Sequence, residues 1–366
     1  MTGAARSWSV TTGVNLSLLT VPCLAFGAQA WLDGEIVVSG RTNKDLRNTG
    51  CLRVRIVGFT VWLLACLATL ALSRAASAQD LEPRAYSQSP TGANFLVMGF
   101  GEIDGSVLFD PSLPITGVHA QLYSSVAGLG HTFGLFGRQA LVTAALPYVW
   151  GNMTGQVFEQ QHNITRSGLA DTRFKFSLNL HGSPALSPQE FVKSRRRSLI
   201  VGASLSVTAP SGQYDPTKLV NLGTNRWGFK PELGVSYPRK RWYFDLYSGV
   251  WFFTENSSFY PGQSTRRQAP LPSLQAHVSY TVRPRLWAAF DSTWYAGGAS
   301  RVDNGPPTGR LNNSRVGATL SIPIGKSQSL KIAYSAGATA RSGANFSSIG
   351  VAWQFLWFDR RGLPIP

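Results

Sequence analysis

Alternation of apolar and polar residues recurs over residues 93–358 of this 366-residue chain and constrains its fold more than any other feature. Between residues 169 and 181, for example, one side carries Phe174, Phe176 and Leu178 and the other carries Arg173, Lys175 and Ser177. Successive side chains of a β-strand point to opposite faces, so such a segment has one apolar and one polar face. The same design returns over residues 274–283 and 349–357. We therefore expect an all-β protein.

Three further features favour a membrane barrel over a soluble β-sandwich. The polar faces are rich in Gly, Ser, Thr and Ala, which is too polar for a dry core between two sheets, and aromatic residues cluster at the strand ends. Charged residues make up only 14% of the chain, whereas soluble domains carry about a quarter. Outer-membrane barrels combine an apolar belt, aromatic girdles and a polar interior. The sequence therefore predicts a transmembrane antiparallel up-and-down β-barrel.

Twelve strands are expected, although ten or fourteen would fit the same pattern. Their approximate bounds are 93–102, 118–133, 138–150, 168–182, 198–210, 226–237, 241–254, 272–283, 285–297, 313–323, 328–339 and 344–358. Long connections (103–117, 151–167, 211–225, 255–271 and 298–312) alternate with tight turns near residues 136, 239, 284 and 325. The exceptions are a longer connection at 183–197 and a short one at 340–343. Short periplasmic turns and longer outer loops are the known asymmetry of these barrels.

A secretory signal peptide is expected ahead of the barrel, over residues 51–78. Two arginines and an apolar stretch over residues 56–72 precede Ala76-Ser77-Ala78, the small-x-small pattern that places cleavage before Gln79. Residues 1–50 resemble neither a signal nor a domain, so we expect translation to start after Met1. The barrel would occupy residues 79–358, followed by a tail at 359–366.

Cysteine content and charge exclude several kinds of chemistry. All three cysteines (Cys23, Cys51 and Cys66) precede Gln79, so the mature chain would have no disulfide, thiol nucleophile or cysteine metal site. The formal net charge is +16, of which about +12 falls on residues 79–366. An anionic outer leaflet and anionic solutes account for this excess as well as nucleic acid does, and no nucleic-acid-binding motif is present. We expect no nucleic-acid partner.

No catalytic or cofactor-binding pattern stands out. The sequence shows no metal-ligand spacing among His119, His131, His162, His181 and His277. Its glycine-rich segments do not open a helix that would cradle a phosphate. A Ser/His/Asp group at the barrel rim, as in an outer-membrane lipase, is the enzymatic alternative. We expect a protein that is not an enzyme and that needs no metal or cofactor.

The polar faces of the expected strands carry charged and aromatic side chains. These are Arg173, Lys175, Lys230, Glu232, Asp245, His277, Asp291, Arg315 and Lys331, together with Tyr243, Tyr247, Trp287 and Tyr295. Because a Lys or Arg facing lipid at mid-membrane costs about 2–4 kcal/mol, we expect these residues to line the lumen. Two interpretations are open: a packed core of ion pairs that plugs the barrel, or a charged constriction that filters solutes. We favour an open lumen with a weak preference for anions, because basic groups are in excess.

Several short stretches resemble a known family. They are LEPRAY at 81–86, PTGANF at 90–95, TNRWGFKPELG at 224–234, SLQAHVSY at 273–280 and NSRVGA at 313–318. With these stretches the chain resembles the outer-membrane family named for the meta-pathway of phenol degradation, whose members are usually described simply as transporters. The resemblance spans nearly all of residues 80–358. It implies a barrel, an outer-membrane location and transport, and it supplies no catalytic or binding residues.

The sequence thus predicts passive passage of small molecules across the outer membrane, with aromatic or hydrophobic solutes as the expected class. Loops 151–167 and 255–271 would gate the lumen, and the four aromatic side chains above would offer stacking surfaces. An outer-membrane enzyme and a structural or adhesive barrel with a filled lumen are the alternatives. The expected partners are the lipid bilayer with its lipopolysaccharide, the outer-membrane assembly machinery and small solutes.

Overall fold

A computed structural model shows how this pattern folds, and it describes residues 81–108, 115–157, 160–194, 198–218, 220–339 and 343–359. The predicted signal peptide at 51–78, the residues before it and residues 360–366 of the predicted tail lie outside these ranges.

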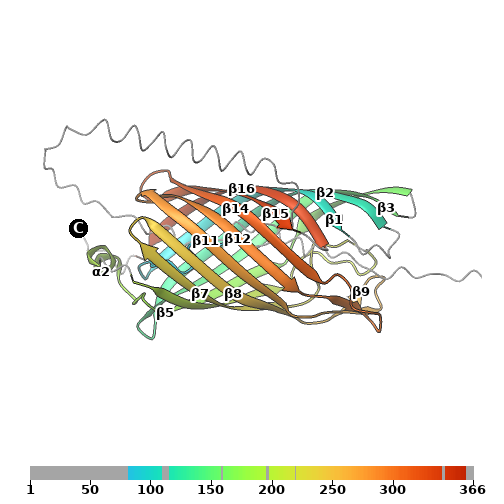
Figure 1. Ribbon diagram of the computed structural model, residues 1–366, viewed down its shortest axis with the longest axis horizontal. Helices are drawn as coiled ribbons and strands as arrows, with labels where there is room; N and C mark the ends of the chain where they lie inside the picture. The colour runs from blue at the N-terminus through green and yellow to red at the C-terminus, as the bar shows by residue number, and fades with distance from the viewer. Residues whose placement is uncertain are drawn as a thin grey trace, which may run out of the picture.

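The strands close into one antiparallel barrel (Figure 1). They are β1 (Ala93–Leu108), β2 (Ile115–Leu135), β3 (Arg138–Val157), β4 (Gln160–Leu169), β5 (Thr172–His181), β6 (Ile200–Ala209), β7 (Gly228–Arg239), β8 (Trp242–Phe253), β11 (Leu271–Arg283), β12 (Leu286–Gly297), β14 (Leu311–Pro323), β15 (Gln328–Thr339) and β16 (Gly343–Phe358). Neighbours in the wall follow one another in the chain, and β1 also pairs with β16. The pairing of β1 with β16 closes the wall and removes the open edges that a flat sheet would expose to lipid.

The strands β4 and β5 share one position in the wall. β4 pairs with the later part of β3, from Tyr148 onward, while β5 pairs with β3 at residues 140–145. Only Ala170 and Asp171 separate the two strands. Over the described residues the barrel therefore has twelve wall positions, which confirms the predicted strand number and the up-and-down topology.

Tight turns join the strands at one end of the barrel. Phe136 and Gly137 both adopt left-handed conformations (φ 50° and 71°), which a type I′ hairpin requires. Lys240 and Arg285 occupy the same region in the turns before β8 and β12. The longer connection at this end contains the short helix α2 (Pro188–Lys193), which begins with a capping box. We call this the inner end, because short turns of such barrels face the periplasm.

Longer loops occupy the opposite, outer end. The loops 254–270 and 298–310 contain β9 (Asn256–Phe259), β10 (Ser264–Gln268) and β13 (Ser300–Val302). These three strands form a separate small sheet beyond the barrel wall, and Figure 1 shows β9 at the end opposite α2. Two of the long connections that the sequence predicts are therefore partly ordered as strands.

The prediction that residues 151–167 form an outer loop is wrong. β3 continues to Val157 and β4 starts at Gln160, and the two form a ladder in which Gly151 lies opposite Arg166. Residues 103–108 likewise belong to β1. Glycine and polar residues break the apolar alternation in these segments and thus mimic a loop. Backbone pairing continues regardless, because a strand that extends beyond the lipid needs no apolar face.

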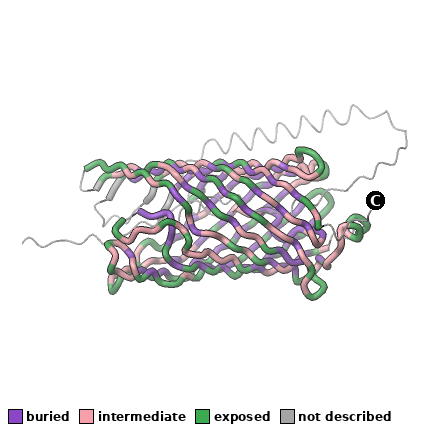
Figure 2. The backbone as a smooth tube through the Cα atoms, turned by 180° about the vertical axis from the view of Figure 1, so that it is seen from behind, coloured by how far each residue is buried: buried purple, intermediate pink, exposed green. Residues whose placement is uncertain are grey.

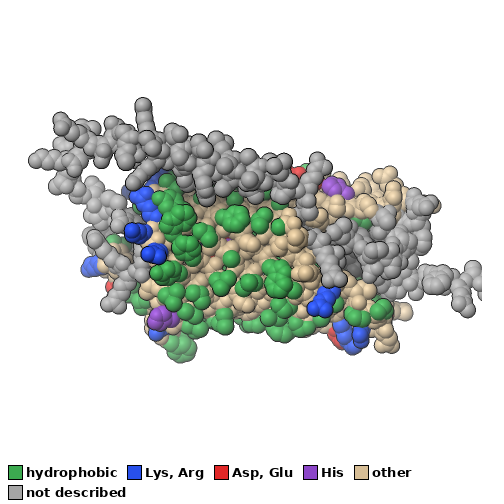
Figure 3. Space-filling view, viewed as in Figure 1, with side chains coloured by type: hydrophobic (Ala, Val, Ile, Leu, Met, Phe, Trp, Pro, Cys, Tyr) green, Lys and Arg blue, Asp and Glu red, His purple; other side chains and the backbone are tan. Residues whose placement is uncertain are grey.

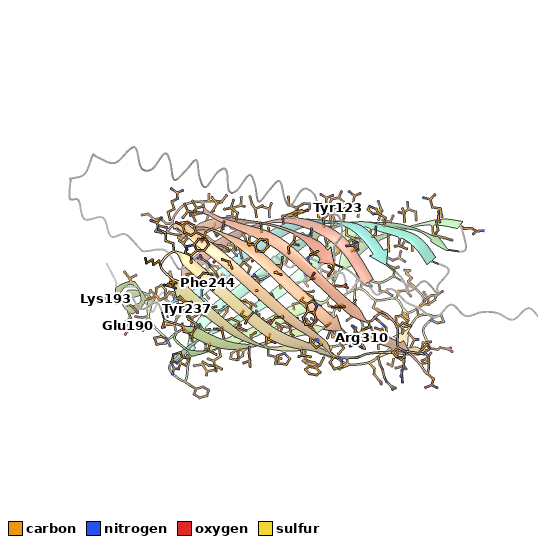
Figure 4. The ribbon with its side chains drawn as sticks, in the orientation of Figure 1. Tyr123, Glu190, Lys193, Tyr237, Phe244 and Arg310 are labelled. Atoms are coloured by element: carbon orange, nitrogen blue, oxygen red, sulfur yellow. The ribbon has the colours of Figure 1, made fainter. Side chains whose placement is uncertain are left out.

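Burial alternates along the strands with the predicted period of two (Figure 2). On β7, Lys230 and Glu232 are buried while Phe229 and Leu233 are exposed. On the face that Figure 3 shows, apolar side chains spread over the barrel body, whereas Lys and Arg gather towards its two ends. Figure 4 shows Tyr237 and Phe244, which are cross-strand neighbours, near the end that carries α2. Such a surface matches an apolar belt with aromatic residues at its margin.

Among the described residues, no helix combines the length and the apolar character needed to cross a membrane.

Candidate functional site

A segment that precedes the first strand lies inside the barrel. Residues 81–92, which we call the lumen segment, contact the buried faces of β5, β6, β7, β8 and β11. Arg84 and Tyr86 of this segment are completely buried, at 0% exposure. The segment joins the wall at Ala93, where β1 begins.

Arg84 anchors the lumen segment to one side of the wall. Its backbone N–H donates to Asp245 on β8 (3.1 Å), and its side chain donates to Ser279 and Thr281 on β11 (2.7 Å each). The guanidinium also lies over the rings of Tyr243 and Trp287, 4.4 and 4.8 Å from their centroids. These aromatic residues, which we expected to stack on a solute, thus contact the protein's own arginine.

Tyr86 fills a space that two glycines provide. Its hydroxyl shares a hydrogen bond with Ser204 on β6 (2.9 Å) and donates to Glu232 on β7 (3.3 Å). Its ring packs edge-on against Tyr247. A Cβ added at Gly202 or Gly234 would lie 2.1 Å from a carbon of the Tyr86 ring. The wall is therefore shaped for this side chain.

Ion pairs surround the lumen segment. Glu82 pairs with Lys175 on β5. On β7, Lys230 pairs with Glu232 (2.6 Å), which also accepts a hydrogen bond from Gln275 on β11 (3.2 Å). Both carboxylate oxygens of Glu232 are thus engaged, one by Tyr86 and the other by Lys230 and Gln275.

His277 and Asp291 form a second buried group on β11 and β12. The His277 Nδ1 lies 2.7 Å from the Asp291 carboxylate, whose other oxygen accepts a hydrogen bond from Thr319 (2.8 Å). The His277 Nε2 has no hydrogen-bond partner among the described residues, so this pair lacks the hydroxyl that a Ser/His/Asp relay requires. The described residues contain no cluster of three or more His, Cys, Asp and Glu side chains that would hold a metal ion.

The remaining sequence candidates are Arg173, Tyr295, Arg315 and Lys331, of which Lys331 lies beside the same Trp287 ring as Arg84. Arg315 on β14 is buried and donates to Ser335, Ser348 (3.1 Å) and the Phe346 carbonyl (3.4 Å). The predicted candidate Tyr295 belongs to a buried apolar cluster with Trp251, Leu271 and Leu311. Arg173 is half-buried on β5, and the ammonium of buried Lys331 lies 5.8 Å from the Trp287 ring centroid.

The interior therefore differs from both interpretations that the sequence left open. At the level of Arg84 and Tyr86 the lumen is filled rather than open, but the filling is a chain segment and not ion pairs between strands alone. Sequence reasoning missed this segment because it has no alternation and precedes the first strand. Its proline, arginine and tyrosine at 83–86 carry no local signal of burial.

An apolar patch lies on the opposite wall, towards the outer end. The patch comprises Ile103, Val118, Ala120, Leu122, Val149, Met153, Val220, Leu222 and Phe346. Seven of these residues belong to β1, β2, β3 and β16, and the other two, Val220 and Leu222, come from loop 210–227. This loop therefore folds back onto the inner wall of the barrel. Buried apolar side chains on the inward faces of β1 to β3 contrast with the polar wall around Arg84.

The break between β4 and β5 holds this loop in place. Asp171, which lies at the break, accepts hydrogen bonds from the Gly212 N–H (3.0 Å) and from the N–H and hydroxyl of Thr224 (2.9 and 2.6 Å). Within the loop, Asp215 accepts hydrogen bonds from the N–H and hydroxyl of Thr217 (3.0 and 2.6 Å). These bonds, together with the ion pair to Lys218 (2.9 Å), lower the pKa of Asp215 to about 2. The loop is thus fixed at both of its ends.

The chain matches the family model described as "Putative MetA-pathway of phenol degradation" over residues 89–355. It belongs to this family. The match spans all twelve wall positions, so the resemblance seen in the short sequence stretches is confirmed. No curated protein matches the sequence.

Among solved structures, an outer membrane channel from Pseudomonas putida F1 is similar, with 18% identity over 75% of this chain and 99% of that one and a TM-score of 0.63. The transport unit of the autotransporter AIDA-I from Escherichia coli covers 73% of this chain and 90% of that one at 9% identity, with a TM-score of 0.43. The first match shows that the fold is that of an outer-membrane β-barrel. The second is too distant to support an argument.

Proposed function

We propose that this protein is a passive channel of the outer membrane for small molecules, with apolar and aromatic solutes as its substrate class. The observation that carries this proposal is the apolar patch inside an otherwise polar barrel. In this structure the wall residues of the patch pack against Val220 and Leu222 of loop 210–227, so a solute would reach it when this loop moves aside. A solute of low polarity gains favourable free energy there, at about 25 cal/mol for each Å² of apolar surface removed from water.

Passage requires that the lumen segment moves, and its bonding suits such a movement. Over the described residues, the backbone of 81–90 forms no backbone hydrogen bond with the wall, whereas Thr91 and Gly92 bond to Leu186 and Thr132. Its anchors are mainly side-chain contacts, and it is continuous with only one strand. Release of the segment therefore leaves every strand pair of the barrel intact, so it can act as a gate.

Export and assembly complete the proposal. A signal peptide at 51–78, cleaved before Gln79, would bring the mature N-terminus close to the lumen segment. The outer-membrane assembly machinery would then insert the barrel beside lipopolysaccharide. N-terminal sequencing of the protein from an outer-membrane fraction tests this step, and a chain that begins at Met1 in the cytoplasm would refute it.

The permeation test uses the apolar patch. We expect reconstituted protein to admit phenol faster than an uncharged sugar of similar mass in liposome flux measurements. Leu122→Asn, which places an amide in the patch, should lower phenol flux several-fold. Ser124→Asn is the matched control, because it adds the same amide two residues along the same face of β2. Equal fluxes for the two variants, or no flux through the wild type, would contradict the proposal.

The gate test uses the ion pair of Glu82 with Lys175. Lys175→Glu sets two carboxylates against each other and should raise single-channel conductance. The exchanged pair, Glu82→Lys with Lys175→Glu, should restore low conductance. A single variant that conducts like the wild type would show that the lumen segment does not limit passage.

A further inference from the structure

Two arginines lie buried beside the small sheet at the outer end. Arg226 immediately precedes Trp227 and β7, and Arg266 lies on β10. They are 4% and 3% exposed, which is unusual for a residue that carries a permanent charge. Neither residue contacts the lumen segment in any hydrogen bond or ion pair that the described residues form.

Each guanidinium has only part of its hydrogen-bonding capacity used. Arg226 donates from one Nη to Gln268, and Arg266 donates from one Nη to Ser300 (2.9 Å). The guanidiniums lie over the rings of Phe253 and Phe259, 4.3 and 5.6 Å from the centroids. Gln268 is two residues from Arg266 on β10 and therefore on the same face of that strand. The two arginines thus meet around Gln268.

Neither guanidinium forms an ion pair with a described residue, and three of their buried nitrogens have no partner. These are Nε and Nη1 of Arg226 and Nη1 of Arg266. A buried, unsatisfied polar group costs about 1–3 kcal/mol, and more when it is charged. Burial lowers the pKa of Arg266 to about 10. Burial and the nearby charge of Arg266 lower the pKa of Arg226 well below its ordinary value, against the opposing charge of Asp171. Two like charges lie close together, and among the described residues no carboxylate forms an ion pair with either of them, so the two guanidiniums favour the binding of an anion.

The acidic and hydroxyl groups nearby are already engaged. Asp171 accepts three hydrogen bonds from Gly212 and Thr224. The Tyr214 hydroxyl donates to the Ser258 carbonyl and accepts from Asn256. The charge of Asp171 still acts on Arg226, but it offsets at most one of the two arginine charges, so the pair keeps a net positive charge that a bound anion would balance.

We propose that Arg226 and Arg266 form a binding site for a small organic carboxylate at the outer mouth of the barrel. Guanidinium N–H groups match the geometry and charge of a carboxylate, and such charge-assisted hydrogen bonds are about twice as strong as neutral ones. The rings of Phe253 and Phe259 limit the approach of water to the site. Carboxylate binding itself needs no conducting pore; only its interpretation as the first contact of a transported solute rests on the proposed function.

Calorimetric titration of the purified, detergent-solubilised full chain with benzoate tests the site. We expect saturable binding of benzoate and at least tenfold weaker binding of benzyl alcohol, which has the ring without the charge. Arg226→Gln and Arg266→Gln should each weaken benzoate binding at least tenfold. Arg267→Gln is the matched control, because Arg267 is the next residue on β10 but is exposed and paired with Glu255 (2.9 Å). It should bind benzoate like the wild type.

Three results would overturn the inference. They are a wild type that does not bind benzoate, equal binding of benzoate and benzyl alcohol, and an equal loss of binding in Arg266→Gln and Arg267→Gln. Heat-modifiable migration on gels verifies that each variant has a folded barrel. If Arg226→Gln fails to fold, benzoate binding by Arg266→Gln, compared with Arg267→Gln, tests the site. A protein that binds benzoate but conducts nothing would refute the channel and leave the site standing.

Discussion

Gly234→Ala provides the sharpest test of the lumen segment. Gly234 lies on β7 with its missing side chain facing Tyr86, and an added Cβ would lie 2.1 Å from the tyrosine ring. No real contact is that short, so either the ring leaves or the wall shifts. Full burial of an aromatic side chain contributes about 1.5–3 kcal/mol. The hydroxyl bonds to Ser204 and Glu232 add about 1 kcal/mol each.

Loss of these contacts removes roughly 3–5 kcal/mol of docking free energy. The ratio of docked to released segment should therefore fall by about a hundredfold or more. Two assays follow the release: single-channel conductance should rise, and trypsin should cleave after Arg84, which is buried in the wild type. Gly228→Ala, also on β7, is the control, because a Cβ there meets its nearest atom at an ordinary 3.5 Å.

A wall shift predicts a different outcome. The Gly234→Ala barrel would then unfold at a lower temperature, with Arg84 still protected from trypsin. Adding Tyr86→Ala would remove the closest contacts and make room for Tyr247, which lies 2.8 Å from the added Cβ, and should restore most of the thermal stability. If Gly234→Ala matches Gly228→Ala in conductance, in proteolysis and in thermal stability, Tyr86 does not occupy this space, and the argument for a gate fails.

Three further expectations concern the wall and the outer loop. A cysteine at Phe174 should react with a lipid-soluble thiol reagent, whereas one at Lys175 should react with a water-soluble reagent only after the lumen segment is released. Asp171→Ala should destabilise loop 210–227 by about 2–4 kcal/mol, because it leaves buried donors of Gly212 and Thr224 unpaired, and proteolysis of the loop reports this loss. The pKa of Asp215 is lowered to about 2, so its contacts should persist as the pH falls from 7 to 3 and be lost only through pH 2, as measured by carboxyl NMR.

Alternation made the wall predictable. Each strand carries its own apolar and polar faces, so the wall strands could be predicted from local sequence. Gly137 likewise indicated the turn at Phe136-Gly137, because glycine favours the left-handed conformation found there. The error at 151–167 arose where strands leave the lipid and no longer need an apolar face. Alternation therefore reports the membrane-spanning part of a strand, and backbone pairing beyond it leaves a weaker trace.

The interior was far less predictable, because its contacts join residues distant in the sequence. Arg84 bonds to Ser279 across 195 positions, and Tyr86 to Glu232 across 146. Pairing of this kind has no local pattern. Alternation identified the charged residues on the inner faces of the strands. Their partners Glu82 and Arg84, however, lie in a segment for which the sequence predicted no structure. A count of charges on strands alone thus suggested an open, cationic lumen.

The polar character of the lumen segment itself suits a reversible gate. A hydrogen bond formed inside the barrel replaces one made to water, so each contributes only about 1 kcal/mol net. The ion pair of Glu82 with Lys175 likewise adds little net stability, because both charged groups regain their hydration when the segment is released. An apolar plug of the same size would lose the full hydrophobic free energy on release and would stay in place. The segment therefore packs tightly while it is docked, yet water competes for most of its contacts, so a small change in free energy is enough to release it.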